Sequence, residues 1–277
     1  MAGTWAARDV AGILRRPTAS DDKYSRGVLG VRTGSGAYPG AAVLGVEAAW
    51  RTGLGMVRYV GPAHDLVLAR RPETVTVEGR VQAWLIGSGS DASTRAAPET
   101  AALRRILSAD APVIVDAGAL DLAPSADAPL IVTPHDREHH RLREALGLAA
   151  ADGDREAAAR ETAAALGGVV LLKGARTLVA APDGSVIVVD AGIPWLATAG
   201  TGDVLAGAIG ALVASAAAAD GARDASSLAA LAASGAWLHG RAAALAAGDL
   251  GAQGGPITAL DLAEALPRAV AQVLAGE

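Results

Sequence analysis

Short apolar runs alternate with longer amphipathic or small-residue segments over much of this 277-residue chain. The short runs predict strands at 27–31, 56–60, 74–77, 83–86, 113–115, 130–132 and 169–172. The segments between them predict helices at 41–51, 64–70, 94–107, 137–146 and 155–166. Strands that alternate with helices form a mostly parallel sheet covered on both faces, so we expect a three-layer α/β/α fold.

The pattern changes in the C-terminal third. Segments 177–181 and 185–189 flank Pro182-Asp183-Gly184 and predict a hairpin, and the residues beyond 203 predict helices at 203–219, 226–247 and 258–273. We find no internal repeat and no shift in composition that would divide the chain. We therefore expect a single domain over residues 1–277, a length that allows a sizeable core.

Composition narrows the class of protein. Hydrophobic residues make up 51% of the chain but aromatic residues only 3%, so Ala, Val, Leu and Ile must fill the core. A net charge of −5 argues against nucleic-acid binding, and the lack of cysteine excludes disulfides and cysteine-ligated zinc. The N-terminus lacks a signal-peptide pattern, and the apolar segment 208–219 is too short to span a membrane. We expect a soluble, cytoplasmic protein without membrane contact.

Polar and glycine-rich residues follow one predicted strand after another, at 34–40, 87–90, 116, 133–135 and 173–177. In parallel sheets, ligands bind at the carboxyl ends of the strands. These segments should therefore line one crevice.

A further glycine-rich segment, Gly200-Thr-Gly202, precedes a very apolar predicted helix. Free backbone N–H groups and the helix dipole favour an anion there, either phosphate or a phosphoryl group in transfer. The segment is neither a Walker A loop nor a GxGxxG fingerprint, because it lacks their remaining residues. Asp203 has two interpretations: a first-turn acid that complements the dipole, which geometry alone favours, or a general base.

Six blocks of sequence, in order, resemble the ADP-dependent NAD(P)H-hydrate dehydratases, the carbohydrate-kinase-related family of the ribokinase-like superfamily. Together the blocks extend over most of the chain. They are "KYSRGVLGVRTGSGAYPGAAVLGVEAAWRTGLGMVRYVGP" (23–62), "LIGSGSD" (85–91), "VIVDAGAL" (113–120), "LIVTPHDREHHRL" (130–142), "LLKGARTLVAAPDG" (171–184) and "ATAGTGDVLAG" (197–207).

The resemblance implies a ribokinase-like fold and a repair reaction. Hydrated NADH or NADPH in its S form would be dehydrated to NAD(P)H, driven by hydrolysis of ADP to AMP and phosphate, with Mg²⁺ as cofactor. A homotetramer is also implied. A fused epimerase domain would need roughly 200 more N-terminal residues, so we expect a standalone dehydratase domain.

The resemblance also assigns roles to residues. Asp203 matches the catalytic base, and the hydrated substrate would contact Ala41, Gly89, His135 and Asp203. The adenine nucleotide would contact Lys173, Gly174, Ala175, Arg176, Thr177, Gly200, Thr201 and Gly202. Asp116 would position the substrate, help to hold Mg²⁺, or act only as a structural cap. Lys23 would meet a phosphate. No residue is assigned as a metal ligand.

The chain departs from the family pattern at three places. The family's TPHPGE is Thr133-Pro-His-Asp-Arg-Glu138 here, its GPG is Gly87-Ser-Gly89, and its PGMA is Pro194-Trp-Leu-Ala197, which places an indole near the nucleotide. His139 and His140 are adjacent and would point about 100° apart on a helix, so we interpret them as surface residues rather than metal ligands.

Two other functions use the same motifs. One is an ATP-dependent small-molecule kinase with the same base and anion hole. The other is a nucleotide-binding module that has lost catalysis, which predicts a damaged anion hole or a missing acid, and both features are intact here. The sequence leaves open the choice between ADP and ATP and between NADH and NADPH.

Overall fold

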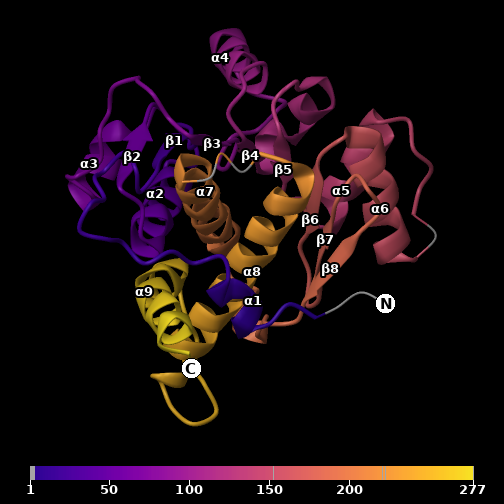
Figure 1. Ribbon diagram of the computed structural model, residues 1–277. Coiled ribbons are helices and arrows are strands. Elements are labelled where there is room, and N and C mark those ends of the chain that lie inside the picture. The colour runs from indigo at the N-terminus through magenta and orange to yellow at the C-terminus, as the bar shows by residue number, and fades with distance from the viewer. Residues whose placement is uncertain (1–3, 152, 220, 222, 277) are drawn as a thin grey trace.

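An eight-stranded sheet with the order β2-β1-β3-β4-β5-β6-β7-β8 forms the centre of the molecule (Figure 1). The computed structural model describes residues 4–151, 153–219, 221 and 223–276. The first six strands are parallel, and β7 and β8 form an antiparallel hairpin at one edge. The strands are β1 (Val28–Arg32), β2 (Met56–Tyr59), β3 (Ala83–Ile86), β4 (Val113–Val115), β5 (Leu130–Val132), β6 (Val169–Leu172), β7 (Thr177–Ala180) and β8 (Val186–Val189).

Helices cover both faces of this sheet, which confirms the three-layer arrangement. One face carries α2 (Gly40–Thr52), α7 (Thr201–Ala219), α8 (Ala225–Gly248) and α9 (Ala259–Ala275). The other carries α4 (Ala97–Leu107), the 3₁₀ segment η1 (Ala117–Ser125), α5 (Asp136–Ala145) and α6 (Arg155–Leu166). Side chains alternate along each strand, so Leu85 joins the first core and Ile86 the second.

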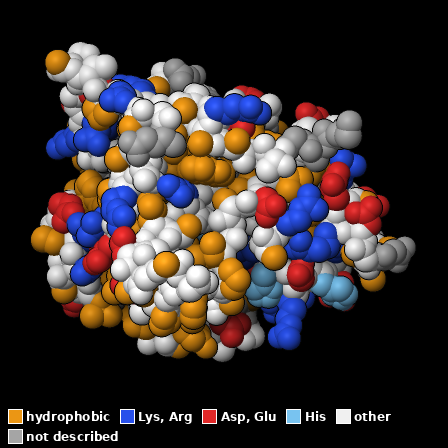
Figure 2. Space-filling model, turned by 90° about the horizontal axis from the view of Figure 1, so that it is seen from below, with side chains coloured by type: hydrophobic (Ala, Val, Ile, Leu, Met, Phe, Trp, Pro, Cys, Tyr) orange, Lys and Arg blue, Asp and Glu red, His pale blue; other side chains and the backbone are white. Residues whose placement is uncertain are grey.

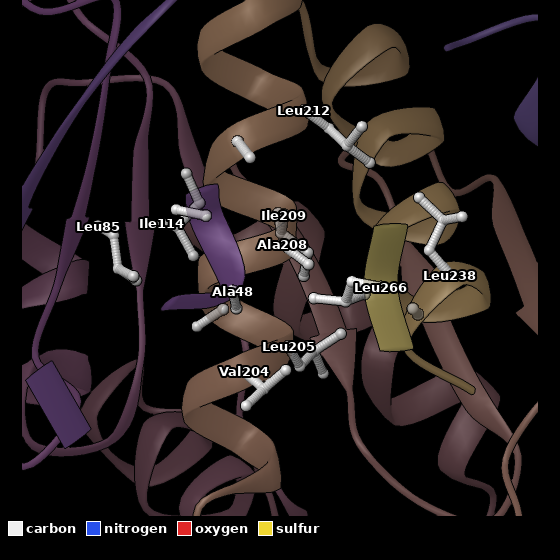
Figure 3. Close-up of a cluster of buried hydrophobic side chains, with 14 of the residues drawn as sticks. Ala48, Leu85, Ile114, Val204, Leu205, Ala208, Ile209, Leu212, Leu238 and Leu266 are labelled. Carbon is white, nitrogen blue, oxygen red and sulfur yellow. The ribbon is translucent and has the colours of Figure 1, made fainter. Parts of the chain in front are cut away.

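Helix α7 lies in the middle of the first core (Figure 3). Val204, Leu205, Ala208 and Ile209 are buried there between the sheet and neighbouring helices. Helix α7 is long and apolar enough to cross a membrane. However, 61% of its most apolar 18-residue stretch is buried inside the protein. This burial agrees with the predicted core helix.

Several predicted elements differ from those observed. The strand predicted at 74–77 is wrong: only Val75 pairs, in an isolated bridge to Arg58, and Val77 is 63% exposed with no partner strand to continue the ladder. Helix α4 begins at Ala97 rather than at 94, because Pro98 suits a first turn that needs no N–H donor. The sequence also did not predict the short segments α1 (Ala7–Ala11), η1 and η2 (Pro194–Leu196), whereas α3 (His64–Arg70) is as predicted.

Two further interpretations are wrong. His139 is buried rather than exposed, and its Nε2 lies 2.9 Å from Thr162 Oγ1, between α5 and α6. Burial, with the nearby Arg143 charge, lowers the pKa of His139 to about 4, so it is a neutral core residue. Lys23 is exposed and its backbone lies against Gly55, at the amino ends of the strands, so it is remote from the carboxyl-end site.

The surface carries charges of both signs. Figure 2 shows basic and acidic side chains intermixed on one face, with hydrophobic side chains between them. Many charged side chains of the protein form ion pairs, among them Arg95 with Asp121 and Arg268 with Asp249.

Candidate active site

Four polar side chains from four consecutive parallel strands meet at the carboxyl edge of the sheet. Asp116 directly follows β4 and is only 3% exposed. Its carboxylate accepts hydrogen bonds from Ser88 Oγ (2.9 Å), Thr133 Oγ1 (2.7 Å) and Lys173 Nζ (3.0 Å), which follow β3, β5 and β6. The common crevice expected from the strand ends is therefore built around Asp116.

Lys173 joins this cluster to helix α5. Its Nζ lies 3.7 Å from Glu138 Oε2 as well as 3.0 Å from Asp116 Oδ1. Burial lowers the pKa of Lys173, but the charges of Asp116 and Glu138 outweigh burial and raise it overall. The ammonium is therefore held charged between two carboxylates.

Asp203 lies in the first turn of α7 and is half-buried. Burial and the Asp116 charge raise its pKa, the Lys173 charge lowers it, and the net result is a pKa of about 7. Among the described residues, none donates a hydrogen bond to its carboxylate. A capping acid accepts backbone N–H groups, which lowers its pKa, as Asp261 does in α9. Asp203 is thus an acid of the first turn of α7, as one interpretation predicted, but among the described residues its carboxylate caps no backbone N–H.

A cavity of about 760 Å³ opens beside the start of α7. Seven of the eight residues predicted to contact the adenine nucleotide line it: Lys173, Gly174, Ala175, Arg176, Thr177, Thr201 and Gly202. Ile193, Leu196, Leu205 and Ala236 provide an apolar wall. Charged and backbone groups at one end and apolar side chains along the wall suit a molecule with phosphates and a flat ring.

Gly200, the eighth predicted contact, does not line this cavity. Its φ of +90° is a backbone conformation that side chains disfavour, and a Cβ there would lie 2.6 Å from Leu44 Cδ1. Gly200 therefore makes the turn that brings Thr201 and Gly202 to the cavity.

A second cavity, of about 450 Å³, lies on the other side of Glu138. Tyr38, Ser90, Glu138 and Arg141 are among its lining residues. Ala41 and Gly89, both predicted substrate contacts, adjoin it, because a Cβ on Gly89 would lie 2.5 Å from Ala41 Cβ and 2.7 Å from Tyr38 O. Glu138 lines this cavity and lies 3.7 Å from Lys173, which lines the first one, so this ion pair lies between the two cavities.

His135 begins helix α5. Its Nδ1 accepts the N–H groups of Arg137 (3.1 Å) and Glu138 (3.3 Å), and the Glu138 carboxylate accepts the N–H of His135 (2.9 Å). This reciprocal arrangement is a capping box. The His and Glu retained in the altered TPHDRE segment therefore fix the start of α5.

The sequence did not reveal His239, which is buried in α8 and lines the first cavity. Its Nε2 lies 2.9 Å from Thr201 O, at the start of α7. Because the two residues are far apart in the chain, only the packing of α7 on α8 shows this contact. Trp195, expected near the nucleotide, does not line the cavity, although Pro194 and Leu196 do.

The site offers few side-chain ligands for Mg²⁺. No group of three His, Cys, Asp or Glu side chains in the described part of the chain is placed to hold a metal ion. Mg²⁺ commonly needs only one or two carboxylates besides substrate phosphates. Glu138, whose carboxylate lies 3.7 Å from Lys173 Nζ, is an oxygen donor at the site that fits such a phosphate-held ion.

The fold defines a class of proteins: it is the three-layer ribokinase-like arrangement. It matches the structure of an ADP/ATP-dependent NAD(P)H-hydrate dehydratase from Bacillus subtilis, co-crystallised with ATP and Mg²⁺, with a TM-score of 0.81 and 29% identity over 98% of this chain and 99% of that chain. Residues 29–268 match the family described as NAD(P)H-hydrate dehydratase. The chain belongs to this family.

Two relatives illustrate the extent of the match. The bifunctional NAD(P)H-hydrate repair enzyme Nnr of Mycobacterium leprae is 44% identical over 88% of this chain and 51% of that protein. The ADP-dependent (S)-NAD(P)H-hydrate dehydratase of Neisseria meningitidis is 37% identical over 83% of this chain and 81% of that protein. The chain thus spans about half the length of the bifunctional relatives.

Proposed function

We propose that this protein dehydrates the S form of hydrated NADH or NADPH to NAD(P)H, using ADP and releasing AMP and phosphate. One observation carries the proposal: Asp203 is half-buried in the glycine-rich start of α7, with a pKa raised to about 7, next to Gly202, which lines the first cavity. Such a carboxylate is matched to accept a hydroxyl proton near neutral pH. The adenine nucleotide would occupy the first cavity and the hydrated dinucleotide the second.

The chemistry follows from this placement. Asp203 takes the proton of the C6 hydroxyl, whose oxygen forms a bond to the β-phosphorus of ADP as the bond to AMP breaks. The N–H groups near Gly200–Gly202 stabilise the charge on the transferring phosphoryl group. The ring-nitrogen lone pair then expels phosphate from C6, and loss of the C5 proton restores the double bond. When bound, Mg²⁺ would neutralise phosphate charge, with Glu138 as an available oxygen donor.

Lys173, which the charges of Asp116 and Glu138 keep protonated, would attract the phosphates into the site. Ala41 and Gly89 pack closely together beside the second cavity, where they would contact the nicotinamide end of the substrate. His135 would contact the substrate through Nε2, since its Nδ1 is used by the cap.

One assay tests the function. The purified protein is incubated with hydrated NADH, Mg²⁺ and either ADP or ATP, and the returning absorbance of the reduced nicotinamide ring is followed together with the nucleotide product. We expect recovery with AMP formation from ADP. No recovery with either nucleotide would contradict the proposal. Transfer to a small alcohol instead would favour an ATP-dependent kinase.

The acidic limb of the pH profile provides a second test. Asp203 must be deprotonated to act as a base, so kcat/KM should rise with pH through its pKa, about 7. After burial, the Asp116 charge is the next contribution that raises this pKa, so Asp116→Asn should move the limb to lower pH. Asp249→Asn removes an exposed carboxylate paired with Arg268 and should leave the limb in place. An unchanged midpoint in Asp116→Asn would disprove the coupling.

The proposal includes a cytoplasmic homotetramer, which the family resemblance alone supports. Light scattering on the purified protein tests the tetramer.

A further inference from the structure

Arg155, the first residue of α6, is bonded to three different parts of the chain. Its Nη2 donates to Lys173 O (2.8 Å) and its Nη1 to Arg176 O (3.1 Å). Its Nε donates to Asp136 Oδ1 (3.0 Å), in the first turn of α5. The guanidinium thus joins α5 and α6 to the loop between β6 and β7, whose residues line the first cavity.

The loop is shaped to this guanidinium. A Cβ on Gly174 would lie 2.7 Å from Arg155 Nη2, so the guanidinium packs directly against the backbone of the loop. The backbone N–H of Lys173 is also fixed, since it donates to Pro134 O at 2.9 Å. Hydrogen bonds therefore fix the backbone of the loop at both of its ends.

Peptide geometry gives this attachment a consequence for ligand binding. In a trans peptide the C=O and the following N–H point in opposite directions. Because Arg155 holds Lys173 O, the N–H of Gly174 is directed away from the guanidinium. In the part of the chain that the structure describes, the N–H groups of Gly174, Ala175 and Arg176 have no acceptor, although all three residues line the cavity. Free backbone N–H groups at a cavity are available to bind phosphate oxygens.

Asp136 orients Arg155. It stands where the family pattern has proline, a residue that could not offer a carboxylate. An exposed ion pair by itself contributes little to the stability of the fold, and the Asp136 side chain is 70% exposed. Its effect here is geometric, because it fixes Nε so that the two terminal nitrogens face the two carbonyls.

We propose that Arg155, oriented by Asp136, is a positioning residue that presents the backbone of the Lys173–Thr177 loop to the phosphates of the adenine nucleotide. This proposal rests on the proposed function only in taking an adenine nucleotide as the ligand. Arg155 itself does not line the cavity.

The test measures ADP affinity by calorimetry, which needs no turnover. We expect Arg155→Ala to weaken ADP binding at least tenfold. Arg155→Lys should recover only part of this loss, because one ammonium cannot span two carbonyls and a carboxylate. Asp136→Asn should weaken ADP binding about threefold. The matched control is Arg160→Ala on the same helix, whose guanidinium pairs only with Glu156 among the described residues and should bind ADP as the wild type does.

Hydrogen exchange provides a readout that separates positioning from general stability. Amides of 173–177 should exchange faster in Arg155→Ala, while those of the sheet core exchange at the wild-type rate. If Arg155→Ala, or Arg155→Lys should the alanine variant fail to fold, binds ADP within threefold of the wild type, the proposal is wrong. If the wild-type protein itself binds no adenine nucleotide, the proposed function fails instead.

Discussion

Replacing Asp203 with asparagine is expected to lower kcat about a thousandfold while ADP binding stays within threefold of the wild-type value. General-base catalysis contributes about 10²–10⁴ in rate, and asparagine cannot accept the proton. Burial, the Asp116 charge and the lack of a hydrogen-bond donor hold the pKa of Asp203 near 7, where a carboxylate is an effective base. Single-turnover kinetics and calorimetry on the same preparation measure the two quantities.

The matched control is Asp261→Asn. Asp261 is also a first-turn acid, but it accepts the N–H of Thr258 in a capping box at the start of α9. Its loss should cost about 1 kcal/mol of stability and leave kcat unchanged. Retention of kcat in Asp203→Asn would remove Asp203 from the role of base.

The same substitution should stabilise the fold at alkaline pH. The folded-state pKa of Asp203, about 7, lies above its ordinary value of 3.8, so the unfolded chain ionises first as pH rises. The protonated carboxyl therefore contributes stability that is complete below about pH 4 and lost as pH rises through 7. Asp203→Asn avoids this loss and should gain up to about 4 kcal/mol at pH 8 but almost nothing at pH 4. Urea unfolding at the two pH values tests this, and a less stable variant at pH 8 would contradict it.

The strands of the sheet, and the polar residues that follow them, could be predicted from the sequence for identifiable reasons. Buried parallel strands such as β4 and β5 are short apolar runs with polar residues directly after them, so Asp116 and Thr133 mark both a strand end and a ligand edge. Short-range patterns are sufficient for such features. The sequence also predicted seven residues that line the first cavity, through motif resemblance.

Features that depend on packing between distant segments could not be predicted in this way. His139 lies in a polar stretch, and only the approach of α6 with Thr162 makes it a buried residue. The 74–77 run has the alternation of a strand, but its neighbour β2 offers pairing at a single position. In the sequence Arg155 is an ordinary first-turn arginine. Only the structure shows that its Nη2 lies 2.8 Å from Lys173 O, directly after β6.

Replacing Gly207 with alanine is expected to destabilise the fold by about 2–3 kcal/mol, and with valine by more. Alanine favours a helix by about 1 kcal/mol over glycine, so intrinsic propensity predicts the opposite sign. Packing determines the sign of the stability change here. A Cβ at 207 would lie 2.2 Å from Gly45 O and 3.0 Å from Ala48 Cβ, so α2 would have to move away from α7. Backbone atoms cannot rotate aside as a flexible side chain can.

The displacement of α2 from α7 should also change the geometry of the candidate active site. Asp203 lies one turn before Gly207 on α7, and Ala41 lies one turn before Gly45 on α2, so the close contact of the two helices sets how the base faces the substrate. A misplacement of about 1 Å can cost roughly a hundredfold in rate, and we expect a loss of kcat of that order in Gly207→Ala. Gly248→Ala is the control, since nothing lies within 4 Å of its Cβ, and it should be neutral or slightly stabilising. Denaturation of both variants measures the difference, and a Gly207→Ala protein as stable as the wild type would show that α2 and α7 can separate without cost.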